Sequence, residues 1–408
     1  MGYPPKISRI FNSTALSVAR VRRGIVFYIM FVVSLFRVAT ADAMPMERRD
    51  SLCHRLSVEL RPAYNIVSHY AMRVDGRPLN SALSLHARYA FSFSPQSRLG
   101  QLYPEVYQGV GVAAYTFLAH ETTGTPMAAY IMQGAKIADF GNKLSLGYEW
   151  NFGISWGWHP NDAMSSRCNV MINVALPLVW RVAPHWELSL IPDYTHFSNG
   201  DTSFSNSGAN LFGLRLGATY LFDAGHTKAD AKRYIKPSEE FEGRNFAQRM
   251  SYDVIIYGGW RADRFLEGGE IYIINKALPI FGLNFQPQYH LNRHFALGLS
   301  LDVQADTTLN LYGGVKNDEN RVVNYSRPPL WQQLEVGISA RGEIQAPIFT
   351  IGVGLGVNML DTGYDSSLLY ATFSLKAFVT KRLFLYFGYR FNSTQCTHNL
   401  MYGLGLRF

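Results

Sequence analysis

The sequence predicts an all-β protein, an antiparallel up-and-down transmembrane β-barrel of an outer membrane. Three observations favour this fold class. The region after residue 41 holds no apolar run near 18 residues, so no membrane-spanning helix is expected there. The chain contains 24 Tyr, 26 Phe and 35 Gly, as expected of aromatic-rich strands joined by tight turns. Several segments alternate apolar residues with small or polar ones, and a closed barrel is the only sheet that leaves no unpaired edge in lipid.

The last predicted strand shows this alternation most clearly. One face is wholly apolar and the other is mostly small or charged, the pattern of a strand between lipid and a lumen. A soluble sandwich, the alternative, would bury the apolar face under a second sheet. A carboxy-terminal Phe on such a strand also resembles the assembly signal of outer-membrane proteins. The apolar positions are Leu400, Tyr402, Leu404, Leu406 and Phe408, with Met401, Gly403, Gly405 and Arg407 between them.

Residues 1–41 predict a signal peptide. They contain six Lys and Arg residues and no acidic residue. A basic cluster at residues 20–23 precedes an apolar run at residues 25–36, and small residues at 39–41 provide a cleavage site. The apolar run is too short for a membrane-spanning helix, which needs roughly 20 residues. We therefore expect a chain that is exported and cleaved after Ala41.

Charge and cysteine content exclude several other classes. Without residues 1–41 the chain keeps 32 Lys and Arg against 30 acidic residues, and no segment concentrates cations among aromatics, so no nucleic-acid partner is expected. Cys53, Cys168 and Cys396 are widely spaced, which gives neither a disulfide framework nor a metal-ligand set. We expect no metal and no organic cofactor.

Strand-like segments fill two regions. Residues 42–222 form a first barrel half, residues 223–250 a charged linker or turn, and residues 251–408 a second half. The predicted arrangement is one barrel of roughly 12 to 16 strands, with two eight-stranded units in tandem as the alternative. The halves end on similar strands, NLFGLRLGATYLF and NLMYGLGLRF, which favours a degenerate internal duplication. If the last strand ends in the periplasm, the linker is periplasmic too.

Three polar side chains share the lipid-facing side of one predicted hairpin. In the strand over residues 186–198 the even positions form the apolar face, yet His196 and Ser198 occupy its outer end. Asn210 lies on the same face of the returning strand. A hydroxyl, an imidazole and an amide that orients it form a triad suited to acyl transfer. Amides around Asn199 and Gly200 would be donors to an oxyanion.

The run HFSNGDTSFSNSGANLFGLRLGATYLF, which begins at His196, resembles the outer-membrane lipid A 3-O-deacylases, the PagL-like acyloxyacyl hydrolases. It shares their H-x-S-N motif, a following N-x-G segment and a strand that ends in Phe. The resemblance implies a serine hydrolase on the outer barrel surface, with His196 as the base and Ser198 as the nucleophile. It assigns Asn199 to the oxyanion hole and matches Asn206 and Gly208 to the N-x-G element. Long two-part members of the family have a similar last strand, whereas the small eight-stranded members lack a second half.

The third triad position departs from the family pattern. It is acidic in the best-known members and falls on Asn210 here, and an amide holds the imidazole tautomer but does not stabilise imidazolium as a carboxylate does. The nearest acidic residues are Asp193, on the opposite face of its strand, and Asp201, which lies in the loop and has the freedom to fold back.

The predicted function is therefore that of an outer-membrane serine esterase that removes an ester-linked acyl chain from lipid A. Its expected partners are lipopolysaccharide of the outer leaflet and outer-membrane lipid, and the sequence gives no oligomeric state. Phospholipid is an alternative substrate for the same triad. A second hypothesis is a non-catalytic pore or structural barrel, since a ring of about 16 strands leaves an aqueous lumen.

Overall fold

The computed structural model describes residues 52–66, 76, 78–161, 164–203, 207–223, 235–236, 238–267, 270–274, 276–317, 322–360, 367–392 and 398–408. The predicted signal peptide at residues 1–41 lies outside this part of the chain. Within it, strands predominate, and we find no helix that is both long and apolar enough to cross a membrane.

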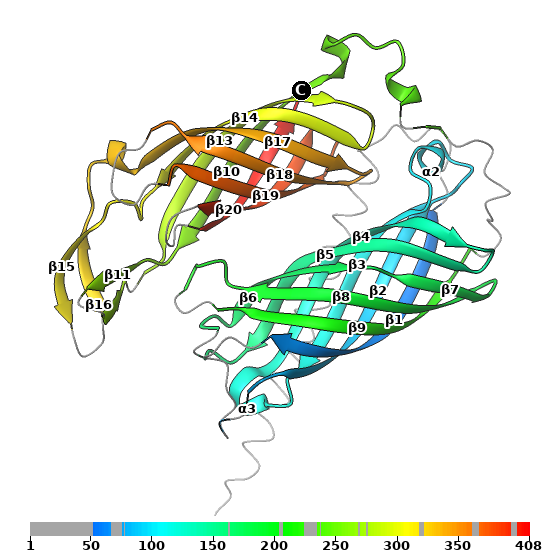
Figure 1. The fold of residues 1–408 in the computed structure, drawn as a ribbon, viewed down its shortest axis with the longest axis horizontal. Helices are drawn as coiled ribbons and strands as arrows, with labels where there is room; N and C mark the ends of the chain where they lie inside the picture. Colours follow the sequence, from blue (N-terminus) through cyan, green and yellow to red (C-terminus); the bar gives the residue numbers. More distant parts are fainter. Residues whose placement is uncertain are drawn as a thin grey trace, which may run out of the picture.

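The first half of the chain folds into one ring of antiparallel strands (Figure 1). Successive strands pair with their neighbours, and the ring closes where the ninth strand pairs with the first. The strands are β1 (Leu52–Ile66), β2 (Ser81–Phe93), β3 (Val106–Thr116), β4 (Gly124–Phe140), β5 (Leu144–Trp158), β6 (Cys168–Ala175), β7 (Leu178–Ala183), β8 (Trp186–Ser198) and β9 (Ala209–Leu221).

This ring has eight strand positions, because β6 and β7 share one of them. Both pair with β5 on one side and with β8 on the other. Pro177 lies in the gap between β6 and β7. Proline has no N–H to donate to a ladder, so the strand is interrupted there.

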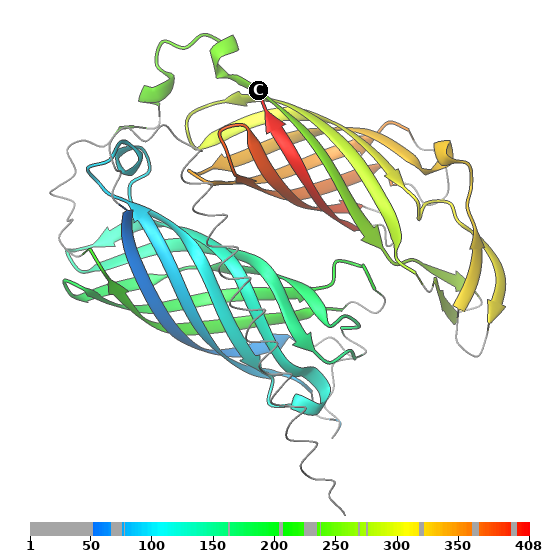
Figure 2. The same ribbon diagram turned by 180° about the vertical axis from the view of Figure 1, so that it is seen from behind.

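The second half forms another closed barrel of eight strands (Figures 1 and 2). Its last strand pairs with its first, as in the first ring. The strands are β10 (Met250–Arg261), β13 (Leu278–His290), β14 (Phe295–Asp306), β17 (Leu334–Gln345), β18 (Phe349–Asn358), β19 (Leu369–Phe378), β20 (Leu383–Asn392) and β21 (Asn399–Arg407).

The all-β, antiparallel barrel class is thus confirmed, but the preference for one ring of 12 to 16 strands is wrong. The alternative of two eight-stranded units is what forms. The physical reason is that β9 and β21, the two similar strands, each pair with the first strand of their own half, Leu52–Ile66 and Met250–Arg261. Each half therefore leaves no open edge to join the other.

The remaining elements lie in the connections. Four short strands from the second half form a separate sheet in the order β11-β12-β16-β15, which extends beyond that barrel (Figure 1). These elements are α2 (Arg98–Leu102), α3 (His120–Thr123), η2 (Glu239–Phe241), η3 (Ala247–Arg249), β11 (Arg264–Glu267), β12 (Glu270–Ile273), β15 (Tyr312–Asn317), β16 (Val322–Ser326) and η4 (Leu330–Gln333).

Charged side chains fill the lumen of the first barrel. Arg215 bonds three buried carboxylates: its Nη1 lies 3.0 Å from Glu59, its Nη2 3.0 Å from Glu149 and its Nε 2.8 Å from Asp193. Arg61 and Arg88 complete a set of three cations and three anions. Pairing of this kind is needed because an unpaired buried charge is costly. The second lumen contains a similar set around Asp253, Lys376 and Asp302.

Most long connections of each barrel gather at one end, although in the first barrel the β2–β3 connection, residues 94–105 with α2, lies at the end with the short turns. In the first barrel, residues 141–143 and 184–185 form short turns at the end where β1 starts, and the β1–β2, β3–β4, β5–β6 and β8–β9 connections lie at the other. In the second barrel, short turns occupy residues 291–294, 346–348 and 379–382. Outer-membrane barrels have short periplasmic turns and longer extracellular loops.

Candidate active site

The β8–β9 hairpin presents the predicted residues on its outer face. His196 and Asn210 lie directly opposite each other in the ladder. Phe197 and Leu211, their neighbours in sequence, point into the barrel and are fully buried. Phe212, two residues after Asn210, points outward and is 54 % exposed. The structure thus confirms the alternation that assigned His196 and Asn210 to the outer face.

Asn210 is hydrogen-bonded to the imidazole. Its Oδ1 lies 2.7 Å from His196 Nδ1 and also accepts a bond of 2.7 Å from the Tyr194 hydroxyl. An amide oxygen only accepts, so Nδ1 carries the proton and Nε2 is left with a free lone pair. This is the tautomer in which a histidine acts as a general base.

Ser198 lies two residues beyond His196 on the same outward face. The two positions are about 6.6 Å apart along the strand, a separation that side chains leaning along a strand span. The Ser198 hydroxyl accepts a hydrogen bond of 2.9 Å from the backbone N–H of Gly200. The turn that follows the strand therefore supplies a donor to the Ser198 oxygen.

The side chain of Asn199 is hydrogen-bonded inside this turn. It is buried, and its side-chain nitrogen donates to the carbonyl of Ser203 at 2.9 Å and to the hydroxyl of Ser165 at 3.2 Å. The side-chain nitrogen thus bonds to loop residues, and the N–H of Gly200 is the donor that points at Ser198.

Glycine is required where the β8–β9 loop approaches the imidazole. Gly208 has a φ of +68°, a left-handed conformation that side chains rarely adopt. A Cβ at this position would lie 3.1 Å from His196 Cε1 and 2.6 Å from the carbonyl oxygen of Phe197. Gly208 therefore lets the backbone pass close to the base. Asn206, the other predicted residue of this element, lies outside the described residues.

Neither acidic alternative takes the place of Asn210. Asp193 points into the lumen, where it is bonded by Arg61 and Arg215. The carboxylate of Asp201 accepts a bond of 3.3 Å from the hydroxyl of Tyr389, which belongs to the second barrel.

Tyr194 is the site residue that the sequence reasoning missed. It occupies the outward position two residues before His196, so the same alternation places it on the site face. Its hydroxyl shares the Asn210 oxygen with the imidazole. Two Ser–His contacts lie elsewhere among the described residues: Ser84 Oγ is 3.0 Å from His86 Nε2, buried in the first lumen where no lipid reaches it, and Ser251 Oγ is 2.8 Å from His290 Nε2 in the second barrel. In the described part of the chain we find no group of His, Cys, Asp and Glu arranged to hold a metal ion.

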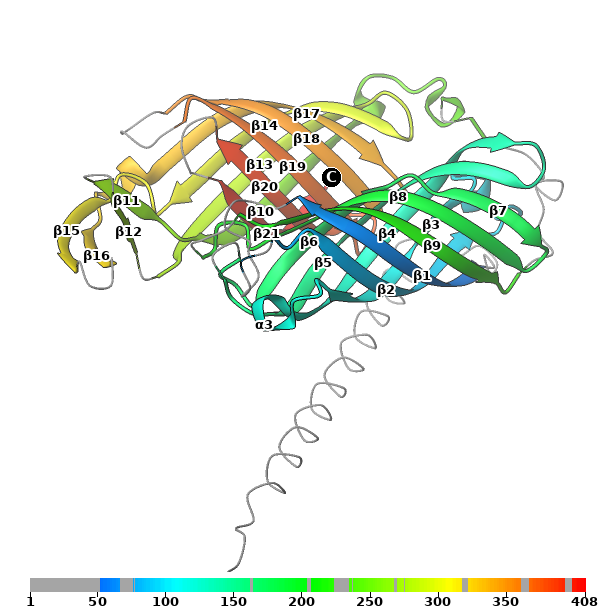
Figure 3. The same cartoon turned by 60° about the horizontal axis from the view of Figure 1, so that its bottom comes forward.

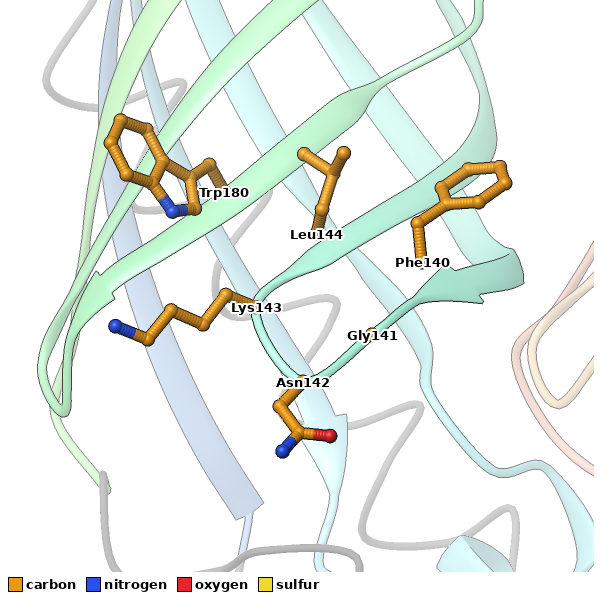
Figure 4. Close-up of a pocket in the computed structure, with 6 residues that line it drawn as sticks. All are labelled: Phe140, Gly141, Asn142, Lys143, Leu144 and Trp180. Carbon is orange, nitrogen blue, oxygen red and sulfur yellow. The ribbon is translucent and has the colours of Figure 1, made fainter.

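The first barrel has a shallow surface hollow (Figure 4), and it lies at the end opposite to the candidate site. It surrounds the short β4–β5 turn and is lined by aromatic rings, an aliphatic side chain and one cation. It is remote from the β8–β9 hairpin. The lining residues are Phe140, Gly141, Asn142, Lys143, Leu144 and Trp180.

Residues 250–408 match the family model described as acyloxyacyl hydrolase, C-terminal domain. The match covers the second barrel, whereas the H-x-S-N motif lies in the first. It confirms the resemblance to the acyloxyacyl hydrolases that the motif indicated. Residues 250–408 are thus similar to the C-terminal domain of acyloxyacyl hydrolases, within a chain that folds into two β-barrels. Comparison with curated proteins gave no match.

Several solved barrels are similar to this chain at low identity. Neisserial surface protein A is 12 % identical, with a TM-score of 0.28, over 41 % of this chain and 96 % of its own. The Acinetobacter baumannii outer membrane protein Omp33 is 9 % identical, with a TM-score of 0.16, over 87 % and 98 %. The Pseudomonas putida toluene transporter TodX is 8 % identical, with a TM-score of 0.18, over 88 % and 89 %. At these TM-scores none of them bears on the function of this chain.

Proposed function

We propose that this protein is a serine esterase of the bacterial outer membrane that removes an ester-linked acyl chain from lipid A. The observation that carries the proposal is the 2.7 Å contact between His196 Nδ1 and Asn210 Oδ1, on an outward barrel face with Ser198 two residues further along. Such a polar group is expensive on a surface that faces lipid, so a role in chemistry explains it better than stability does.

The reaction begins with the Ser198 hydroxyl. Its Oγ attacks the ester carbonyl while His196 Nε2 takes the hydroxyl proton. The carbonyl oxygen becomes an oxyanion, which the N–H groups of the β8–β9 turn stabilise. The C–O bond then breaks, and His196 returns the proton to the sugar oxygen that leaves. Water hydrolyses the acyl-serine by the same steps and releases a fatty acid.

The location of the site supports a lipid substrate of the outer leaflet. The site lies at the end of the first barrel that carries most of the long connections, those of β1–β2, β3–β4, β5–β6 and β8–β9, and long loops mark the extracellular end in proteins of this kind. Lipid A fills that leaflet, and its esters lie near the headgroup level. Export through a signal peptide at residues 1–41, cleaved after Ala41, belongs to the same proposal.

Release of fatty acid from lipid A tests the proposal. The purified full chain in mixed micelles is expected to shorten lipid A by one acyl chain, as detected by mass spectrometry, and to leave phosphatidylethanolamine intact. Ser198→Ala is expected to abolish release. Ser166→Ala is the matched control, because this hydroxyl lies in a neighbouring loop and, among the described residues, bonds the backbone of Cys168.

Heat-modifiable migration in gels checks that both variants remain folded barrels. Release that persists in Ser198→Ala contradicts the proposed nucleophile. Cleavage of phosphatidylethanolamine instead of lipid A keeps the esterase and replaces its substrate.

A further inference from the structure

The two barrels pack side by side through an apolar seam, which we define as Phe91 and Trp150 of the first barrel with Ile348, Phe349 and Leu375 of the second. All five are buried, although by register Phe91, Trp150 and Leu375 point outward. Trp150 and Phe349 meet edge to face, with ring centroids 5.2 Å apart. Figure 3 shows the two barrels beside each other, and the seam residues lie on β2 and β5 of the first barrel and on β18, β19 and the turn before β18 of the second.

Two outward glutamines confirm that the second barrel covers this face. Gln108 and Gln133 lie opposite Phe91 and Trp150 in the ladders, yet their exposed fractions are 0 % and 2 %. Outward residues away from the seam, such as Leu355, remain well exposed. The barrels also contact each other at the short-turn end, where Tyr103 meets His294 with centroids 5.4 Å apart.

At the other end the second barrel contacts the turn of the candidate site. The carbonyl of Asp201 accepts a hydrogen bond of 2.7 Å from the N–H of Ala262. The Asp201 carboxylate accepts from Tyr389, and Leu400 packs so closely on Gly200 that a Cβ there would overlap its side chain. Asp201 has a φ of 62°, a left-handed conformation that is costly for a residue other than glycine and that the contacts from the second barrel help to hold.

We propose that the second barrel is a positioning domain, which clamps the residue 199–201 turn through Leu400, Tyr389 and Ala262. The clamp fixes the N–H of Gly200 on the Ser198 oxygen. The clamp contacts the turn and not the outward apolar faces of β8 and β9, which would bind the acyl chains of the substrate. The expected effect of the clamp on kcat rests on the proposed function. Its expected effect on the order of the residue 199–201 turn does not.

The kinetic test compares variants of the full chain in which a contact to the turn is removed. Leu400→Ala is expected to lower kcat roughly tenfold, because small displacements of a catalytic group are costly. Tyr389→Phe is expected to lower kcat about fivefold, the effect of one hydrogen bond. KM is expected to stay unchanged in both. A structural weakening of the barrel would instead reduce the active fraction, which active-site titration measures.

Matched controls exist on the same barrel. Leu404 lies on the same strand and face as Leu400 but is 54 % exposed, against 8 % for Leu400. Tyr252 is an outward tyrosine stacked on Phe285 of its own barrel. Leu404→Ala and Tyr252→Phe are expected to retain wild-type kcat.

Hydrogen exchange provides the readout that does not depend on activity. In Leu400→Ala and Tyr389→Phe, the amides of residues 199–203 are expected to exchange at least several-fold faster than in the control variants. Equal exchange and equal kcat in Leu400→Ala and Leu404→Ala overturn the clamp. If the wild-type chain releases no fatty acid, the proposed function fails, while the exchange comparison still decides this inference.

Discussion

In the proposed esterase, Asn210 limits the chemistry available to His196. Its oxygen fixes the tautomer at 2.7 Å, but a neutral amide stabilises the imidazolium of the transition state less than a carboxylate does. Replacing Asn210 by Asp keeps the shape and adds the charge. Hydrogen bonds to charged groups are worth about 1 kcal/mol more than neutral ones, so Asn210→Asp is expected to raise kcat about fivefold.

The measurement is the initial rate of fatty-acid release from lipid A at neutral pH. Asn65→Asp serves as control, because Asn65 lies nearby and accepts a bond from the backbone N–H of Asn210 but does not bond to the imidazole. A rate that falls in Asn210→Asp contradicts this role of Asn210.

Much of the site could be predicted from the sequence because a strand repeats every two residues. That period alone put His196, Ser198 and Asn210 on one face, and the hairpin brought His196 and Asn210 together. Tyr194 was within reach of the same reasoning. The contacts of Tyr389 and Leu400 were not, because almost 200 residues separate them from the turn and no local pattern encodes such a contact.

The side chains of strand β9 point alternately to two sides of the barrel wall. Those at even positions lie on the outward face with the candidate site, and those at odd positions point into the lumen. Arg215, on the lumen side, bonds Glu59, Glu149 and Asp193. Arg215→Met leaves one negative charge uncompensated in the lumen. Breaking a buried ion pair costs about 3 to 5 kcal/mol, so the free energy of unfolding of the first barrel is expected to fall by that amount.

Urea unfolding in lipid vesicles, followed by tryptophan fluorescence, measures this loss. Arg98→Met is the control, because Arg98 is an exposed residue of α2. An unchanged unfolding midpoint in Arg215→Met shows that the lumen network adds no stability.

The whole molecule contains two narrow rings, and this bears on the pore hypothesis. That hypothesis required a wide lumen from about 16 strands, whereas eight-stranded barrels are just wide enough to be filled by side chains. Ion pairs fill both lumens here. The purified chain in a planar bilayer is therefore expected to show no steady conductance, with a general porin as positive control. Stepwise channel openings contradict this expectation.

The number of rings could not be predicted from alternation. Alternation tells which way each side chain points, but closure depends on which distant strands pair, as β9 does with β1 and β21 with β10. The similarity of β9 and β21 was the available signal, since both occupy the closing position of a ring. This similarity predicts an internal duplication, and the structure shows that each copy closes a ring of its own.

Among the described strand pairings, every one that builds the two rings stays within a single ring. The seam between the barrels is therefore held by side-chain packing and a few loop bonds, and surrounding acyl chains compete for the same apolar surface. Lipids that solvate this surface well favour separation of the rings, and lipids that solvate it poorly favour their association. The composition of the bilayer thus becomes a variable that sets how often the second barrel holds the turn of residues 199–201 in the proposed site.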